Sequence, residues 1–195
     1  MRWDSLFDDL EAQFSAERAL ERESEISERA RVELAAIELG DRLRAVAGSG
    51  IKIVLADGSI IRGSLRHVGG EWLGLVDGSR EWLVPCASVL SYEGLGRSVR
   101  KPLSPMQRSL GISAALRALA RDRAELIVYL SARTGDGYKV QGVIDRVGRD
   151  HFDLAVVPDG EVRRVGNVRA VLTIPFSSLA ALSSAGGQDL PRGNY

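Results

Sequence analysis

Residues 63–75 read GSLRHVGGEWLGL, and residues 142–154 read GVIDRVGRDHFDL. The two stretches align without a gap at an offset of 79 positions. Both contain a glycine, an apolar residue two positions on, a Val-Gly pair, an acidic residue, an aromatic ring and a leucine. A run of this length that recurs within one chain indicates an internal repeat. We therefore expect one small folding unit to occur twice.

A second match follows these stretches, with one segment after each of them. Residues 84–89 read VPCASV and residues 174–179 read IPFSSL, which is an offset of 90 positions. The change in offset places an insertion of 11 residues in the second copy, which we expect at residues 158–168. Each copy is also preceded by a segment with helical spacing of apolar residues.

The pattern inside each copy is that of short strands. Alternating apolar residues at 51–55 indicate a half-buried strand, and further strands are predicted at 59–68, 71–76, 80–85, 87–92 and 125–131. The connections between these strands are too short for parallel crossovers, so the strands must pair antiparallel. Gly63 and Gly142 fall inside strands, where glycine indicates a sharp bend. Five short, bent strands predict a small β-barrel.

Two helices are predicted outside the strands. Residues 5–46 show helical spacing, with Ser5 as N-cap, and a second helix is predicted to begin with Ser104 as N-cap and Pro105 at its first position and to run to Arg123. The first helix has an apolar stripe near its start, then a charged stretch at 17–29. Two interpretations of this helix are open. It is either a solvated helix held by charge pairs or an arm of coiled-coil type that docks a protein partner or a second copy. The stripe is formed by Trp3, Leu6, Phe7, Leu10 and Phe14.

These elements predict an α+β chain with a long N-terminal helix and two tandem small β-barrels of Sm-like or SH3-like type, each preceded by a helix. The helical arm is expected at residues 1–31, and the first helix-plus-barrel unit at 32–95. A basic linker at 96–104 precedes the second unit at 105–182. The small and polar residues 183–195 are expected to form a disordered tail.

The motif order resembles the Sm-like family, which includes bacterial Hfq. Residues 51–58 read I-x-I-x-L-x-D-G, and the glycine stretches and the φ-P-φ-x-S-φ segments follow, so the resemblance covers residues 34–92 and 116–182. It implies a helix before five bent strands, subunits that join by strand pairing into rings, and RNA as the ligand. The family's RNA-contacting residues are not matched, because VGG, VGR, LVPC and TIPF stand at residues 68–70, 147–149, 83–86 and 173–176.

The whole chain also resembles a family from high-GC Gram-positive bacteria, a resemblance that implies no particular activity. The matching residues are W-D-x-L-F-x-D-L-E at positions 3–11, with positions 5 and 8 free, and A-L-A-R-D-R at positions 118–123.

The charges are balanced overall but not along the chain. The sequence has 26 basic and 26 acidic residues, which leaves no global field to attract nucleic acid. One interpretation pairs the acidic N-terminal region with a basic segment in the middle of the chain, and the alternative makes that segment a phosphate-binding surface for RNA or DNA. The basic residues are Arg97, Arg100, Lys101, Arg108, Arg117, Arg121 and Arg123.

The sequence shows no pattern typical of an enzyme, and we expect no catalytic residues and no cofactor. Cys86 is the single cysteine, so no internal disulfide can form, and it has no evident base beside it. The two histidines, His67 and His151, occupy non-equivalent places without ligand spacing, so no metal site is expected. No small-molecule substrate is evident, and no apolar stretch approaches the roughly 20 residues that span a membrane.

We therefore expect a cytoplasmic, non-enzymatic protein that binds or scaffolds other proteins. Its contacts would be made by the N-terminal stripe and the paired barrels. The alternative is a regulatory protein that binds RNA or DNA through residues 97–123.

Overall fold

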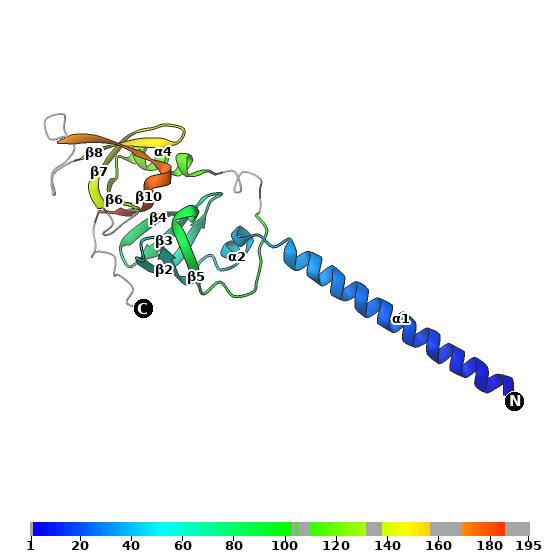
Figure 1. Ribbon diagram of the computed structural model, residues 1–195. Helices are drawn as coiled ribbons and strands as arrows, with labels where there is room; N and C mark the ends of the chain where they lie inside the picture. Colours follow the sequence, from blue (N-terminus) through cyan, green and yellow to red (C-terminus); the bar gives the residue numbers. More distant parts are fainter. Residues whose placement is uncertain (1, 103, 105–109, 132–137, 157–168, 186–195) are drawn as a thin grey trace. The chain divides into compact units, whose positions relative to one another are not determined.

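A computed structural model describes residues 2–102, 104, 110–131, 138–156 and 169–185 of the 195-residue chain. In the first helix, side chains are described from residue 13 onward, apart from those at positions 16 and 19. The described chain combines helices with one antiparallel sheet of ten strands, in the order β5-β1-β2-β3-β4-β10-β6-β7-β8-β9 (Figure 1). The predicted α+β class is confirmed.

The N-terminal segment forms one compact unit at Met1–Glu38 and the rest of the chain forms another at Leu39–Tyr195. The first unit holds α1 (Arg2–Ala35), and the second begins with α2 (Leu39–Ala45). The single helix predicted over residues 5–46 is therefore wrong. The Ile37 amide bonds to the Leu34 carbonyl three residues back (3.2 Å), a contact that tightens and ends the last turn.

The first repeat contains five strands and a short 3-10 turn. These are β1 (Gly50–Leu55), β2 (Ile60–Val68), β3 (Trp72–Asp77), β4 (Arg80–Pro85), η1 (Cys86–Ser88) and β5 (Val89–Glu93). β1 pairs with both β2 and β5, so the strand order is β5-β1-β2-β3-β4.

The second repeat has the same order of elements. It consists of β6 (Glu125–Leu130), β7 (Tyr138–Val147), β8 (His151–Val156), β9 (Ala170–Pro175), η2 (Phe176–Ser178) and β10 (Leu179–Ser184). The strand order β10-β6-β7-β8-β9 matches that of the first repeat. Even the bulges correspond, since β2 and β3 lose register between Leu65 and His67, and β7 and β8 lose it between Ile144 and Arg146. The predicted insertion at 158–168 lies outside the described residues.

Gly63 and Gly142 have equivalent surroundings, as the sequence predicts. Gly63 lies opposite Ile51, and Gly142 lies opposite Leu126. A Cβ atom on Gly63 would lie 2.8 Å from the Val76 carbonyl oxygen, and one on Gly142 would lie 2.4 Å from the Ala155 carbonyl oxygen. In both repeats the neighbouring strand therefore approaches the backbone where a side chain would stand, so glycine is required.

The helix before the second repeat begins later than predicted. α4 (Ile112–Asp122) starts after Gly111, whose extended backbone forms the N-cap. The prediction of one continuous helix from Pro105 to Arg123 is wrong, because residues 110 and 111 are not helical, whereas the predicted start at Pro105 lies among residues 105–109, outside the described residues. The helix ends at Asp122, and Arg123 forms its C-cap with a left-handed φ of 49°.

Each repeat has its own hydrophobic core, and each core takes apolar residues from the other repeat. Leu43 of α2 joins the core of the first repeat, and Leu116 of α4 joins that of the second. Tyr129 of the second repeat is part of the first core, while Trp72 of the first repeat contacts the second. This exchange explains why residues 39–195 form a single compact unit.

Candidate functional site

The two repeats join through β4, which lies at one edge of the first repeat, and β10, which lies at one edge of the second (Figure 1). Leu83 pairs with Leu182, and Trp82 pairs with Ser183. The rings of Trp82 and Tyr129 lie 5.4 Å apart across this junction, and the Arg80 guanidinium lies 5.1 Å from the centre of the Trp82 ring. The junction is therefore a continuous backbone ladder with an aromatic core.

Two further hydrogen bonds tie the repeats together. The buried Ser88 hydroxyl lies 2.7 Å from the Ala180 carbonyl oxygen and 2.8 Å from the Pro85 carbonyl oxygen, so its single proton is shared between these two acceptors. The Glu81 amide donates to the Ser184 hydroxyl oxygen at 3.0 Å. These side-chain hydrogen bonds give partners to the Ala180 carbonyl and the Glu81 amide at the junction.

The strands at the two ends of the ten-stranded sheet are β5 and β9. In the alignment at offset 90, β5 is the counterpart of β10 and β9 is the counterpart of β4. Positions that the junction buries are open at these ends: Leu90 is 68% exposed, whereas its counterpart Ala180 is 1% exposed. Likewise Pro85 is buried at the junction, whereas its counterpart Pro175 is exposed.

No described strand pairs with the side of β9 that faces away from β8, and backbone groups of β9 point to that side. Phe176 donates its amide to the Asp150 carbonyl (2.8 Å), in the register that pairs Thr173 with Asp153. Bonded residues alternate along an antiparallel ladder, so the N–H and C=O groups of Thr173 point away from β8. Unpaired edge groups of this kind are a template for a further strand.

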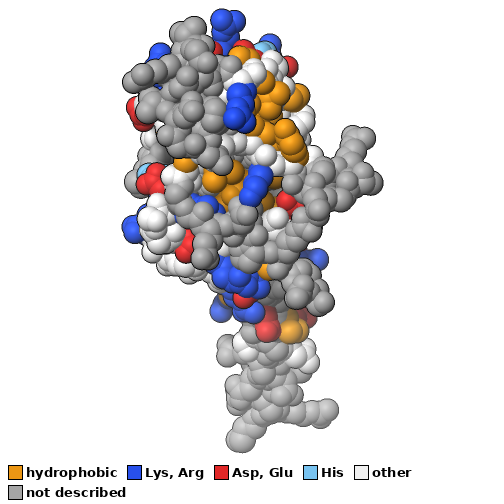
Figure 2. Space-filling view, turned by 90° about the vertical axis from the view of Figure 1, so that its left-hand side faces the viewer, with side chains coloured by type: hydrophobic (Ala, Val, Ile, Leu, Met, Phe, Trp, Pro, Cys, Tyr) orange, Lys and Arg blue, Asp and Glu red, His pale blue; other side chains and the backbone are white. Residues whose placement is uncertain are grey.

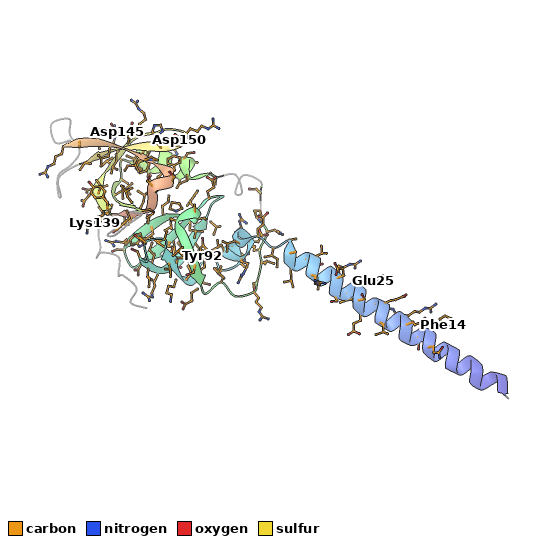
Figure 3. All side chains as sticks on the ribbon, in the orientation of Figure 1. Phe14, Glu25, Tyr92, Lys139, Asp145 and Asp150 are labelled. Atoms are coloured by element: carbon orange, nitrogen blue, oxygen red, sulfur yellow. The ribbon has the colours of Figure 1, made fainter. Side chains whose placement is uncertain are left out.

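The predicted contact residues of the N-terminal arm lie on α1. The side chains of the first four of them are outside the described residues, so the structure does not test the stripe. Phe14 projects from α1 and is exposed (Figure 3). Further along the same helix Leu20, Ile26 and Val32 are also exposed. A helix with this many exposed apolar side chains gains stability when a partner covers them.

The basic linker is bound to α2 through one buried carboxylate. Asp41 is completely buried and contacts Arg44 Nη1 (3.0 Å) and Lys101 Nζ (2.6 Å) through its two oxygens. Its backbone carbonyl accepts the Arg100 amide (2.9 Å), and Arg42 donates to the Gly96 carbonyl (2.5 Å). Lys101 of the candidate nucleic-acid surface is therefore used in an internal ion pair.

The remaining described members of the basic set lie on two elements. Arg97 and Arg100 are exposed in the segment after β5, whereas Arg117 and Arg121 are exposed on α4 and Arg123 caps it. Arg108 lies outside the described residues. On the face drawn in Figure 2, basic side chains lie among apolar and acidic ones rather than in one continuous surface.

One shallow hollow gathers three arginines. Arg117 and Arg121 of α4 and Arg146 of β7 line it, and Asp145 lies beside them. Arg146 was not predicted as part of this basic set, because it lies 25 residues beyond Arg121 in the sequence and only the packing of α4 on β7 brings the two together.

Cys86 and Asp150 are two of the described titratable residues whose pKa is shifted. Burial raises the pKa of the Cys86 thiol above its ordinary value, so the thiol is a weak nucleophile at neutral pH. Asp150 Oδ1 lies 2.8 Å from His151 Nδ1, and this hydrogen bond lowers the pKa of the exposed Asp150 carboxyl. Within the described parts of the chain, no three His, Cys, Asp or Glu side chains gather as metal ligands. No described helix is long and apolar enough to cross a membrane.

Models of known protein families return no match to this chain, and neither do the sequences of curated proteins.

Proposed function

We propose that this protein is a non-enzymatic, cytoplasmic scaffold whose two repeats are Sm-like barrels and whose partners include further copies of itself. The observation that carries the proposal is the β4–β10 junction within one chain. It joins the two kinds of edge strand that also occur at β9 and β5, which have no second strand neighbour among the described residues.

The proposed contact between copies repeats the internal junction. β9 of one copy would pair antiparallel with β5 of a second copy, in the way that β4 pairs with β10 within one chain. The pair Leu83–Leu182 then predicts that Thr173 lies opposite Tyr92 of the second copy. Such a head-to-tail contact uses different surfaces on the two copies, so it produces a ring where the rotation closes and a filament where it does not.

The N-terminal stripe is proposed as a second contact surface, for a protein partner or another copy. Replacing Phe7 and Phe14 together by Ser removes two large apolar side chains from one helix face and should abolish this contact. The matched control is Ile26→Ser, which removes an exposed apolar side chain from α1 outside the stripe. Equal partner recovery by all three proteins in affinity purification would refute the role of the stripe.

The edge contact is tested by the mass of the protein in solution. Leu90→Lys places a charge on the free side of β5, and Thr173→Pro removes an outward N–H from β9 without breaking the ladder to β8. Each variant alone should run as a monomer in light scattering. Tyr138→Lys is the matched control, because it puts the same charge at an exposed apolar position of an interior strand.

Mixing the two edge variants makes the test specific. The Leu90→Lys chain keeps an intact β9 and the Thr173→Pro chain keeps an intact β5, so the mixture should form a 1:1 dimer and nothing larger. A contact through two identical surfaces would not be restored by mixing. A monomeric wild-type protein at high micromolar concentration would refute the edge contact.

Nucleic-acid binding remains the second candidate, and the arginine hollow favours it. Three arginines around one hollow could hold a phosphate group. Binding to a 30-nucleotide RNA should weaken steeply between about 50 and 200 mM salt. Arg117→Ala with Arg121→Ala should lower the slope of that dependence by about two. The absence of a mobility shift for RNA and duplex DNA at low salt would rule this candidate out.

A further inference from the structure

The turn between β2 and β3 of the first repeat binds the chain segment that leads into the second repeat. The Gly70 amide and the Trp72 indole N–H both donate to the Leu110 carbonyl oxygen, each at 3.0 Å. Leu110 lies two residues before Ile112, the first residue of α4. Besides the β4–β10 ladder, the two repeats are therefore joined by one carbonyl held between two donors.

The matching turn between β7 and β8 of the second repeat has the same geometry. Gly69 donates its amide to the Trp72 carbonyl at 2.9 Å, and Gly148 donates its amide to the His151 carbonyl at 2.9 Å. A Cβ atom on either glycine would lie less than 3.0 Å from a ring nitrogen, Trp72 Nε1 or His151 Nε2. In both turns a ring nitrogen of the aromatic residue therefore lies over the glycine.

The turn of the second repeat has no such carbonyl bound to it among the described residues. The Arg149 amide and the His151 ring occupy the positions that Gly70 and Trp72 occupy in the first repeat. No carbonyl oxygen of the described residues accepts a hydrogen bond from either of them. Arg149 is exposed and the side chain of His151 is 43% exposed, so a carbonyl from outside the chain can reach both donors.

The segment that enters the first repeat matches the segment that enters the second. Residues 37–45 read IELGDRLRA and residues 110–118 read LGISAALRA, an offset of 73 positions. This alignment pairs Leu39 with Ile112, which are the first residues of α2 and α4. The leucines of the shared Leu-Arg-Ala triplet enter the first and the second core. The two segments are therefore equivalent in sequence and in the way their helices dock.

Ile37 is then the counterpart of Leu110. Each of these residues precedes its helix by two positions and has neither helical nor strand backbone. Among the described residues no backbone N–H donates to the Ile37 carbonyl. Leu39 is 44% exposed, whereas its counterpart Ile112 is 7% exposed. The segment before the first repeat thus lacks the contacts that its counterpart has within the chain.

We propose that the turn at residues 148–151 of one copy binds residues 37–39 of a second copy, with the Arg149 amide and the His151 ring donating to the Ile37 carbonyl. The proposal rests on the edge contact proposed above, because the internal junction combines the same two features, a strand pair and a bound carbonyl. Binding at this second point also covers the apolar side chain at the start of α2.

The His151 ring makes this contact depend on pH. Nδ1 lies 2.8 Å from Asp150 Oδ1, and a carboxylate oxygen only accepts hydrogen bonds. A neutral ring therefore carries its proton on Nδ1 and has none to donate from Nε2, whereas a protonated ring donates from both nitrogens. Histidine side chains change their charge between about pH 5 and 8. Acidification should therefore strengthen the contact, while the Trp72 indole donates at every pH.

The contact also brings a carboxylate toward the ring. Glu38 of the second copy is the counterpart of Gly111, whose Cβ atom would lie 3.5 Å from Glu71 Oε2, and Asp150 is the counterpart of Glu71. A positive ring offsets the repulsion between these two carboxylates. Pro175, which pairs with His151 on β9, is uncharged. The charged residues on the other elements around the ring are Arg149 and Asp150 of the turn, Arg117 of α4, and Asp145 and Arg146 of β7.

The test is sedimentation velocity of the full chain at about pH 7.5 and about pH 5.5. We expect the wild type to associate about tenfold more tightly at the lower pH, which is the effect of about one hydrogen bond. His151→Phe keeps a ring without a donor, so it should associate weakly at both pH values. His151→Trp copies the first repeat and should associate tightly at both. His67→Phe is the matched control, because it removes the other histidine and should keep the response to pH.

A variant of the bound segment tests the other side of the contact. Leu39→Lys should weaken association at both pH values, whereas Tyr138→Lys, with the same change at an exposed position of an interior strand, should not. Equal association of the wild type at both pH values, or a response to pH that survives His151→Phe, would overturn this inference and leave the edge contact standing. A wild type that is monomeric at both pH values would overturn both proposals. Circular dichroism at both pH values checks the fold of every variant.

Discussion

Replacing Gly142 by alanine tests whether the bent strand of each repeat needs glycine. The added Cβ would lie 2.4 Å from the Ala155 carbonyl oxygen and 3.0 Å from Leu154 Cγ. At Gly63 the corresponding distance to the Val76 carbonyl oxygen is 2.8 Å. Both obstacles include backbone, which cannot rotate away as a flexible side chain can, so the paired strands must separate.

The size of the effect follows from these distances. A contact of 2.4 Å is far inside the range that real Cβ atoms adopt, so β7 and β8 must move apart by several tenths of an ångström. Overpacking of this kind costs about 1–3 kcal/mol, and more where the ladder is disturbed. We expect Gly142→Ala to lower the free energy of unfolding by about 3 kcal/mol and Gly63→Ala by about 2 kcal/mol. For a chain of this length, each kcal/mol corresponds to roughly 2–4 °C in Tm.

Gly50→Ala is the matched control. Gly50 begins β1, and a Cβ atom there would meet nothing within 4 Å. Because alanine restricts the unfolded chain, this variant should be as stable as the wild type or more stable by about 0.4–1 kcal/mol. Calorimetry and chemical denaturation measure the three variants. If Gly142→Ala proved as stable as Gly50→Ala, the equivalence of the two bent strands would lose its physical basis.

Three further perturbations have expected outcomes. Asp41→Asn should lower the free energy of unfolding by about 2–3 kcal/mol, because a completely buried carboxylate loses its charge beside two cations. Urea denaturation measures this loss, and an unchanged urea midpoint would contradict it. Burial raises the pKa of the Cys86 thiol above 9.0, so the unfolded chain loses this proton first and stability should fall as the pH rises past 9.0. Cys86→Ala should make that decline shallower, and an identical alkaline profile would count against the assignment. Ser88→Ala should cost about 1–2 kcal/mol, because the Ala180 carbonyl loses its donor, whereas Ser178→Ala, at the counterpart position, should be nearly neutral in a monomer; equal losses in thermal melts would argue against the junction bond.

Much of the local structure could be predicted from the sequence. The strand predicted at 80–85 is β4 with the same bounds, and alternation placed the neighbouring strands within a few residues. The helix boundaries were predicted less well. Residues 5–46 show helical spacing throughout, yet the chain breaks after Ala35, because α2 docks Leu43 into the first core while α1 forms a separate unit. Periodicity measures the spacing of apolar residues and does not show which helix the core accepts.

Some of the candidate surfaces could also be predicted from the sequence, and others could not. The apolar stripe predicted at residues 3–14 and the run of basic residues are visible in the sequence, since both depend on neighbouring positions. The arginine hollow and the use of Lys101 by Asp41 were not visible, because each joins residues that are 25 or 60 positions apart.

The sequence alone determined the duplication, the succession of strands along the first repeat and the positions of the two bending glycines. These properties follow from alternation, turn residues and steric space, which act over a few neighbouring residues. Only the tertiary structure decided that β4 joins β10, and that β5 and β9 are left at the ends of the sheet. It also decided that the turn before β3 binds the Leu110 carbonyl. These contacts join residues that are far apart in the sequence, such as Leu83 and Leu182, and no local pattern encodes their distance in space.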